Sequence, residues 1–201
     1  MSDDSLSMLA RPQIQLMGRQ KPAFQVLGLS GLGAATTLAL MLTRHRGLSL
    51  SAMACLAATA IATFLALVMV TKIITGQETI VYYHHEMAVI LTTALLLWLI
   101  HQPILPYLDI TIIGVGLFLA FGRIGCFMVG CCHGRPSRKG VCYGQAHVDA
   151  GFPAYLAGVH LFPIQLAESA WVLLITAIGT AIIWNGWPAG SAFAWYVISY
   201  D

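Results

Sequence analysis

Charged residues are scarce in this sequence. Lys, Arg, Asp and Glu together make up 9% of its 201 residues, whereas hydrophobic residues make up 58%. A soluble domain carries about 25% charged residues, so this composition excludes a soluble globular enzyme and a disordered chain. The formal net charge of +2 is too small for a nucleic-acid-binding face. We therefore predict an integral membrane protein and expect no nucleic-acid partner.

Four long stretches contain no charged residue at all. They comprise residues 22–43, 47–71, 87–108 and 169–200. A membrane-spanning helix needs about 20 mostly apolar residues, and these stretches show no strand-like alternation. The sequence therefore predicts an all-α fold, a multi-pass transmembrane helical bundle of about six to seven spans. The predicted spans lie near residues 22–43, 49–74, 84–100, 110–129, 162–184 and 189–200, the last too short to cross alone.

The chain shows no internal repeat, and we predict a single transmembrane domain over residues 22–201. The segment 1–21 mixes charged and apolar residues, which is typical of an interfacial amphipathic segment; a partly ordered leader is the alternative. No cleavable signal peptide is expected, because the basic residues come late and no clear cleavage site follows a short apolar core. A polar loop is predicted at 131–161, either a lid over a site or a solvated connector.

Basic residues bear on the orientation in the membrane. With the N-terminus in the cytoplasm, seven Lys and Arg residues fall inside, and only Arg44 and Arg46 fall outside, with Arg123 left out as intramembrane. The positive-inside rule favours that arrangement. This argument assumes that the counted Lys and Arg residues determine the orientation and do not bind lipid phosphate.

A glycine-rich motif interrupts the apolar run before the polar loop. It reads Gly-Arg-Ile-Gly-Cys-Phe-Met-Val-Gly-Cys-Cys-His-Gly over residues 122–134. An arginine inside a bilayer costs several kcal/mol unless it is paired or hydrated, and its guanidinium matches a phosphate bidentately. Glycines around Arg123 permit close helix packing or the approach of a lipid head group. The motif thus indicates a lipid-phosphate site; the alternative is an arginine that snorkels to the interface.

This motif resembles the signature of the prolipoprotein diacylglyceryl transferases (the Lgt family), whose standard form is Gly-Arg-Ile-Gly-Asn-Phe-x-Asn-Gly-Glu. A second block, Phe-Pro-Ile-Gln-Leu-Ala-Glu at 162–168, resembles the family's His-Pro-Ser-Gln-Leu-Tyr-Glu. The resemblance covers roughly residues 70–201 and implies an Lgt-like fold in the bacterial cytoplasmic (inner) membrane. It also implies an enzyme that moves the diacylglyceryl group of the phospholipid phosphatidylglycerol onto a lipobox cysteine of a lipoprotein precursor, at the outer face, and releases glycerol phosphate.

The resemblance assigns expected roles residue by residue. Arg123 would hold the lipid phosphate, and Glu168 would position Arg123. The family's His-Gly-Gly motif lies about 40 residues before its arginine, and His84 and His85 stand 39 and 38 residues before Arg123. One of them is therefore the expected base, with an interfacial polar cap as the alternative. The expected substrate-binding residues are Gly122, Gly125, Cys126, Gly130, Gln165 and Arg135. No cofactor and no metal are expected.

The sequence also departs from the family pattern. Glu86 and Met87 stand where the family has two glycines, and Cys126 and Cys131 stand where it has an asparagine and a glutamate. The family's further arginine, past a Tyr-x-x-Tyr pattern, has no counterpart before the last residue. These departures support an alternative function, a non-catalytic transmembrane subunit or lipid-binding scaffold of a larger membrane complex.

Cysteine and histidine gather between residues 126 and 147. Thiolates and imidazoles suit zinc, copper or iron, and a metal or proton transporter is a distant alternative function. The spacing matches no standard Cys-x-x-Cys pair, however, and small reduced residues that pack a tight turn are the favoured interpretation. A disulfide from Cys131 or Cys132 to Cys142 is a further alternative. The residues concerned are Cys126, Cys131, Cys132, His133, Cys142 and His147.

Overall fold

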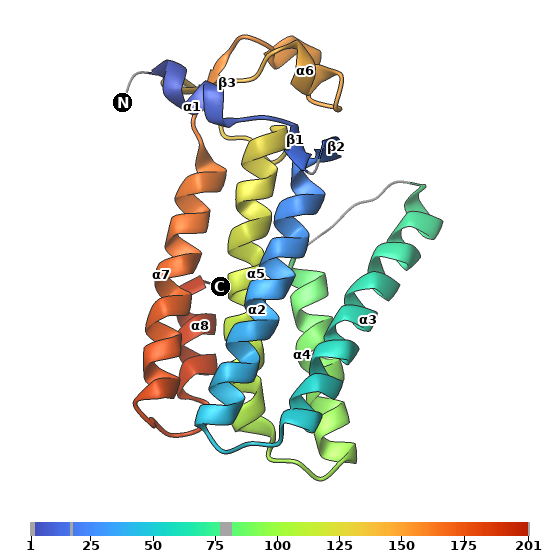
Figure 1. Cartoon of the computed structure of the whole chain (residues 1–201), viewed down its shortest axis with the longest axis vertical. Coiled ribbons are helices and arrows are strands. Elements are labelled where there is room, and N and C mark those ends of the chain that lie inside the picture. Colours follow the sequence, from blue (N-terminus) through green and yellow to red (C-terminus); the bar gives the residue numbers. More distant parts are fainter. Residues whose placement is uncertain (1–2, 17, 77–81, 201) are drawn as a thin grey trace. The chain divides into compact units, whose positions relative to one another are not determined.

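The computed structural model describes residues 3–16, 18–76 and 82–200, which are mainly helical (Figure 1). The helices are α1 (Asp3–Leu9), α2 (Ala23–His45), α3 (Leu50–Thr75), α4 (Tyr82–Leu99), α5 (Ile104–Val129), α6 (Gln145–Val148), α7 (Ile164–Trp184) and α8 (Ser191–Tyr200), with a 3₁₀ turn η1 (Ala154–Leu156). The strands form two antiparallel pairs, β1 (Gln13–Leu16) with β2 (Arg19–Pro22) and β3 (Pro136–Cys142) with β4 (His160–Leu161). The predicted all-α, multi-pass class is confirmed, with the short strand pairs in the segments predicted to flank the spans.

Four helices in the described part of the chain are long and apolar enough to cross a membrane. These are α2, α3, α5 and α7, and they make the chain an integral membrane protein. Helices α4 and α8 occupy the other two predicted spans. The first turn of α4 is polar, and α8 has only 10 residues. The total of six to seven spans therefore stays a prediction.

Helix α5 begins at Ile104, six residues before the predicted span, because the charge of Asp109 is accommodated inside the helix. The Asp109 carboxylate accepts hydrogen bonds from the main-chain N–H groups of Gly190 (2.7 Å) and Phe193 (2.8 Å). These groups lie at the start of α8, where the helix dipole stabilises a negative charge. An acidic residue that is satisfied in this way need not end an apolar helix.

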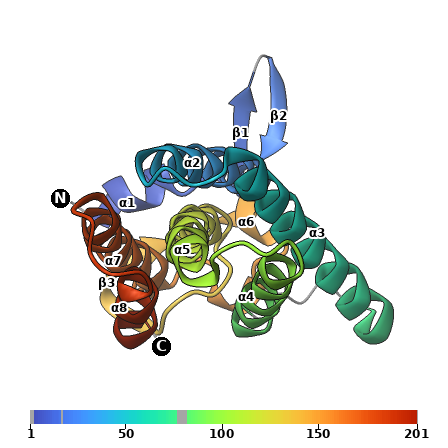
Figure 2. The same ribbon diagram turned by 90° about the horizontal axis from the view of Figure 1, so that it is seen from below.

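The chain divides into two compact units, and helices α2, α5 and α7 each contribute residues to both. Unit 2 comprises residues 35–115 and 175–201. Within it, α3 and α4 lie side by side (Figures 1 and 2). The fully buried Tyr107 joins α5 to the start of α3, since its hydroxyl accepts a hydrogen bond from the main-chain N–H of Ser49 (2.9 Å).

Unit 1 comprises residues 1–34 and 116–174 and holds its own hydrophobic core. The Tyr143 hydroxyl in this core donates a hydrogen bond to the carbonyl oxygen of Phe127 (3.0 Å). This bond ties the polar loop to the last turns of α5. The buried core residues are Ala10, Phe127, Val141, Tyr143, Phe152 and Leu161.

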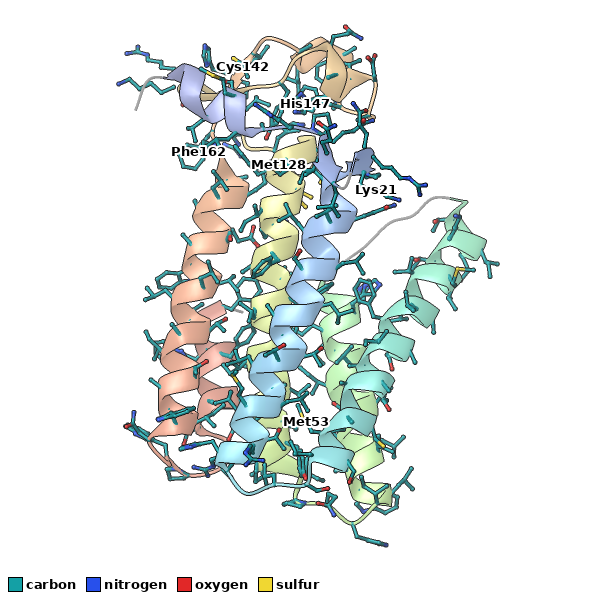
Figure 3. The ribbon with its side chains drawn as sticks, viewed as in Figure 1. Lys21, Met53, Met128, Cys142, His147 and Phe162 are labelled. Atoms are coloured by element: carbon teal, nitrogen blue, oxygen red, sulfur yellow. The ribbon has the colours of Figure 1, made fainter. Side chains whose placement is uncertain are left out.

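The N-terminal segment belongs to the same unit as the polar loop. Helix α1 lies against β3 (Figure 1), and the main-chain N–H of Cys142 donates a hydrogen bond to the Ser7 hydroxyl (3.0 Å). Figure 3 shows Cys142 and His147 at this end of unit 1. Two segments that flank different spans but share contacts must lie on the same side of the membrane.

Candidate functional site

An ion pair between two spanning helices forms the centre of the candidate site. The Arg123 guanidinium on α5 lies 2.7 Å from a carboxylate oxygen of Glu168 on α7. The side chains are 21% and 24% exposed, respectively. A charge in an apolar span is costly unless a partner compensates it. The pair therefore holds a cation on α5 that remains partly accessible to a ligand.

Close contacts between helices fix the frame around Arg123. A Cβ atom on Gly125 would lie 3.0 Å from the ring of Phe24 on α2, so glycine permits this approach. The Ser169 hydroxyl donates a hydrogen bond to the carbonyl oxygen of Ala120 (3.0 Å), which joins α7 to α5 one residue from Glu168. Gly122 has no atom within 4 Å of its Cβ position. The space beside Arg123 at Gly122 is open rather than filled by a neighbouring helix.

A strained turn follows α5 at residues 130–132. Gly130 and Cys132 both adopt left-handed backbone conformations, with φ of +85° and +51°. A Cβ atom at Gly130 would lie only 2.8 Å from the Phe152 ring. Gln165, whose exposed fraction is 1%, donates a hydrogen bond from its amide to the carbonyl oxygen of Cys131 (2.8 Å). The conformation of the turn thus depends on a glycine at position 130 and on the hydrogen bond from Gln165 of α7.

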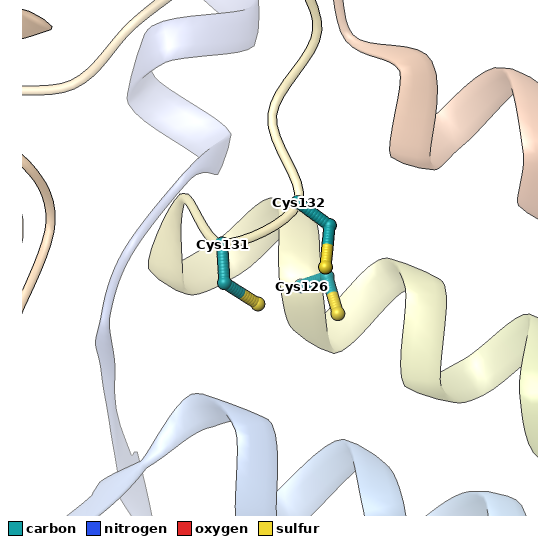
Figure 4. A group of neighbouring side chains, drawn as sticks. All are labelled: Cys126, Cys131 and Cys132. Carbon is teal, nitrogen blue, oxygen red and sulfur yellow. The ribbon is translucent and has the colours of Figure 1, made fainter. Parts of the chain in front are cut away.

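This turn brings three cysteine side chains together. The Sγ atoms of Cys126, Cys131 and Cys132 all lie within 4.8 Å of one another (Figure 4). Cys126 is buried on α5, whereas Cys131 and Cys132 are exposed. No disulfide joins the five cysteines, all of which lie in the described ranges. Three converging sulfur atoms form a donor set suited to a thiophilic metal ion.

The wider group of cysteines and histidines that the sequence suggested is not one cluster. The Cys142 thiol donates a hydrogen bond to the carbonyl oxygen of Gly158 (3.7 Å). His147 is buried against the Tyr143 ring, with 4.9 Å between the ring centroids. His133 packs edge-on against Phe152. Only the three thiols at the end of α5 therefore converge among these residues of the described chain.

Burial and charge alter the acidity of groups in the extramembrane part of unit 1. Burial raises the pKa of the Tyr143 hydroxyl and lowers the pKa of His147, which is the expected direction for groups that lose water. Hydrogen bonds from the thiols of Cys126 and Cys131 lower the pKa of the Cys132 thiol, and the Arg123 guanidinium acts in the same direction. A thiolate at Cys132 is accordingly stabilised beside the ion pair.

The two histidines expected as bases lie in unit 2, in the first turn of α4. His85 and Glu86 are buried, and the His85 ring packs against Phe64 of α3 with 4.9 Å between the ring centroids. His84 is exposed. Their catalytic role stays a prediction, and so does the interfacial-cap alternative.

Arg135, expected to bind substrate, lies at the mouth of the polar loop. It lines an open hollow of about 460 Å³ together with Gly134, Phe162 and Ile164. Its carbonyl oxygen accepts a hydrogen bond from the main-chain N–H of Phe162 (3.0 Å). The side chain of Arg135 is therefore placed next to the block that opens α7.

Sequence reasoning left three contributors out of the predicted site, namely Cys131, Cys132 and Ser169. The Cys-x-x-x-x-Cys-Cys spacing was visible, but spacing alone does not show that the chain reverses at Gly130. The motif Gly-Cys-Cys after a long apolar helix was the available signal, because glycine commonly occupies the left-handed position at a helix end. Ser169 carried no signal beyond its position next to Glu168.

Comparisons with known proteins agree with the resemblance of the two motifs. The family model described as "Prolipoprotein diacylglyceryl transferase" matches residues 82–201. The chain is 33% identical over 100 residues to a phosphatidylglycerol–prolipoprotein diacylglyceryl transferase of Clostridium tetani and 31% identical over 104 residues to the corresponding transferase 2 of Clostridium perfringens.

These alignments cover 48% and 49% of this chain, and 37% of each relative. A third relative, from Dehalococcoides mccartyi, is 30% identical over 93 residues, which is 46% of this chain and 35% of that protein. The chain thus spans little more than a third of the length of the curated relatives it matches. The family model covers more than half of the chain, including both Arg123 and Glu168. The chain belongs to the prolipoprotein diacylglyceryl transferase family.

Proposed function

We propose that this protein transfers the diacylglyceryl group of phosphatidylglycerol to the thiol of a cysteine in a lipoprotein precursor. The observation that carries the proposal is the Arg123–Glu168 ion pair, with 2.7 Å between the charged groups, inside two spanning helices. The three curated relatives carry names that state this transfer. Membership of the family supports transfer over the alternative of a non-catalytic subunit.

The ion pair suits the phosphodiester of the lipid. Arg123 presents a planar fork of donors, and a phosphate accepts two parallel hydrogen bonds from such a fork. Glu168 occupies one edge of the guanidinium, which orients the remaining donors and leaves the pair electrically neutral before the lipid binds. As the glyceryl carbon–oxygen bond breaks, negative charge grows on the departing phosphate, and a fixed cation stabilises that charge.

The remaining roles follow the resemblance and are part of the proposal. Gly122 and Gly125 keep bulky side chains away from the head group, with open space at Gly122. Gln165 holds the turn at Cys131, and Arg135 stands at the hollow beside α7. His84 or His85 would accept the thiol proton.

We further propose that α4 crosses the membrane. The N-terminal segment and the polar loop share contacts and so lie on one side. If α2, α3 and α5 each cross once, a further crossing must occur between the end of α3 and the start of α5. Helix α4 has 18 residues, or about 27 Å of helix, which is close to the hydrocarbon thickness of about 30 Å. The polar loop would face outward from a bacterial inner membrane.

Reconstitution tests the transfer. The purified chain would be placed in vesicles of phosphatidylglycerol with a lipobox peptide, and the thioether product would be measured by mass spectrometry. Arg123→Ala and Glu168→Ala should each lower the rate by about 100-fold or more, as expected for loss of a group that stabilises developing charge. Arg138→Ala, which removes an exposed arginine of β3, should change the rate less than about twofold.

Two outcomes would contradict the proposal. The first is full transfer by both the Arg123 and the Glu168 variants, which would remove the ion pair from the mechanism. The second is no transfer by the wild-type chain together with a tightly retained partner after purification in mild detergent. That result would favour the scaffold alternative.

A further inference from the structure

The transfer as proposed above does not use the three thiols at the end of α5. Their Sγ atoms lie within 4.8 Å of one another, and they come from the last turn of a spanning helix and the turn that follows it (Figure 4). Arg123 lies three residues before Cys126 on α5, and residues three apart are neighbours on one face of a helix. The three thiols therefore lie near the Arg123–Glu168 ion pair.

Packing alone does not explain the cluster. Small thiols that fill a core are buried, yet Cys131 and Cys132 are exposed. Cys132 also holds a left-handed backbone conformation with φ of +51°, which costs a residue with a side chain about 1–2 kcal/mol. Such strained positions concentrate at functional sites. Here the strained conformation directs the Cys132 thiol back toward Cys126 (Figure 4).

The arrangement fits a tetrahedral zinc ion. Zinc–sulfur bonds of about 2.3 Å place tetrahedral sulfur ligands about 3.8 Å apart, so each thiol has to move by no more than about 1 Å. Three protein ligands with a fourth position left open are typical of catalytic rather than structural zinc. Three thiolates and Zn²⁺ carry a net charge of −1.

We propose that Cys126, Cys131 and Cys132 form a three-thiolate Zn²⁺ site whose open fourth position takes the thiol of the acceptor cysteine. The assignment of the fourth ligand rests on the proposed transferase function. A hollow of about 240 Å³ is lined by Cys131 and Cys132 together with Gly130 and Phe152. It gives a cysteine side chain a route to the metal from the extramembrane side of unit 1.

The site would supply the thiolate that the transfer needs. A thiol that binds a metal ion is deprotonated, and its proton passes to the histidine base of the proposed transfer. The acceptor sulfur then forms a bond to the glyceryl carbon as the bond from that carbon to the phosphate oxygen breaks. The electron pair of the broken bond leaves with glycerol phosphate, next to Arg123. The product is a neutral thioether, so neither an oxidant nor a reductant is consumed.

Metal binding can be measured without any transfer assay. The full chain would be purified in mild detergent under reducing conditions, stripped with a chelator and titrated with Co²⁺, whose thiolate charge-transfer absorption reports sulfur ligation. We expect one Co²⁺ per chain, displaced by one Zn²⁺. X-ray absorption of the zinc-loaded wild-type chain should give three sulfur neighbours at about 2.3 Å.

Cysteine variants locate the site. Loss of a residue that only orients a metal ligand weakens metal affinity by about 10–100-fold. Loss of a ligand itself should weaken it more, so we expect Cys126→Ser, Cys131→Ser and Cys132→Ser each to weaken Zn²⁺ binding by more than about 100-fold. Cys55→Ser and Cys142→Ser, outside the cluster, are the matched controls and should change it less than twofold. No saturable binding by the wild-type chain would overturn the proposal. Equal weakening by Cys142→Ser, or a disulfide among the three thiols in the purified chain, would do the same.

The metal site and the transferase function can fail separately. Stoichiometric zinc with three sulfur ligands but no transfer would uphold the metal site and reject the transfer. Undiminished transfer by the stripped chain would uphold the transfer and reject the role of zinc in it.

Discussion

The side-chain amide of Gln165, at the start of α7, donates a hydrogen bond to the main-chain carbonyl of Cys131 over 2.8 Å. This bond links the second family block to the turn that carries the thiols. Gln165 is almost fully buried, whereas Cys131 is exposed, so the bond connects the interior of unit 1 to its surface. The geometry of the turn therefore depends on a residue 34 positions away.

Removal of this bond should destabilise the protein. Gln165→Leu keeps the side-chain volume but removes the hydrogen bond to the Cys131 carbonyl, and a typical hydrogen bond contributes about 0.5–1.5 kcal/mol. We expect a lower midpoint of thermal unfolding in detergent. The matched control is Gln145→Leu, which removes an exposed hydrogen bond to Asp149 and should shift the midpoint little. Equal shifts in the two variants would show that the Gln165–Cys131 hydrogen bond stabilises the protein no more than an exposed one.

The Arg123–Glu168 pair should show energetic coupling. In a double-mutant cycle with Arg123→Gln and Glu168→Gln, we expect a coupling free energy of about 1 kcal/mol or more, since the residues are in direct contact. The combination of Arg138→Ala with Glu168→Gln should be additive within about 0.5 kcal/mol. Unfolding in detergent measures both cycles, and additivity in the first would count against a functional pair.

Gly130 should resist substitution more than a glycine of similar backbone conformation. Gly130→Ala both strains a φ of +85° and places a Cβ 2.8 Å from Phe152. Gly158→Ala strains a φ of +78° but meets nothing within 4 Å. The Gly158 variant should lose about 1–2 kcal/mol of stability. The Gly130 variant should lose more, because its new Cβ also meets the Phe152 ring. In a Phe152→Ala background, Gly130→Ala should cost no more than Gly158→Ala costs in the wild-type chain; an undiminished cost would exclude the clash with Phe152 as its cause.

Asp109 should stabilise unit 2 through α8. Asp109→Ala leaves the N–H groups of Gly190 and Phe193 without their acceptor and removes a favourable charge from a helix start. We expect a loss of about 1–3 kcal/mol and faster amide hydrogen exchange in α8. Asp149→Ala, at an exposed position, provides the control. Unchanged exchange in α8 would contradict this role.

Acid should destabilise unit 1 through His147. Burial lowers the pKa of His147 in the folded protein, so the unfolded chain binds the proton more readily. The contribution of His147 to the free energy of unfolding is therefore fully present above the ordinary histidine pKa of about 6.5. It declines as the pH falls below that value. Thermal unfolding at pH 5 and 7.5 should show a smaller difference in His147→Gln than in the wild-type chain. An identical difference would assign the acid sensitivity to other groups.

The helices of this protein are predictable because long uncharged stretches leave few alternatives in a bilayer. The start of α5 was missed because the acceptance of Asp109 depends on N–H groups some 80 residues later. The β1–β2 pair was missed because strands of four residues carry too little pattern. Arg123 could be named in advance because intramembrane charges are rare, and Glu168 because it matches the second block of the resemblance to the family. The convergence of the three thiols could not be predicted from the sequence. It depends on the left-handed backbone conformation of Cys132 and on the hydrogen bond from Gln165 to the Cys131 carbonyl.

The hydrogen bond between Ser7 and Cys142 spans 135 positions, and it has a consequence for how the protein is made. Residues 1–34 belong to the same compact unit as residues 116–174. They must therefore wait through the synthesis of residues 35–115 before their partners exist, whereas residues 35–115 of unit 2 can associate with one another earlier. Contacts of such long sequence separation form slowly. Unit 1, with the candidate site, can accordingly form only after residues 35–115 of unit 2 have been synthesised.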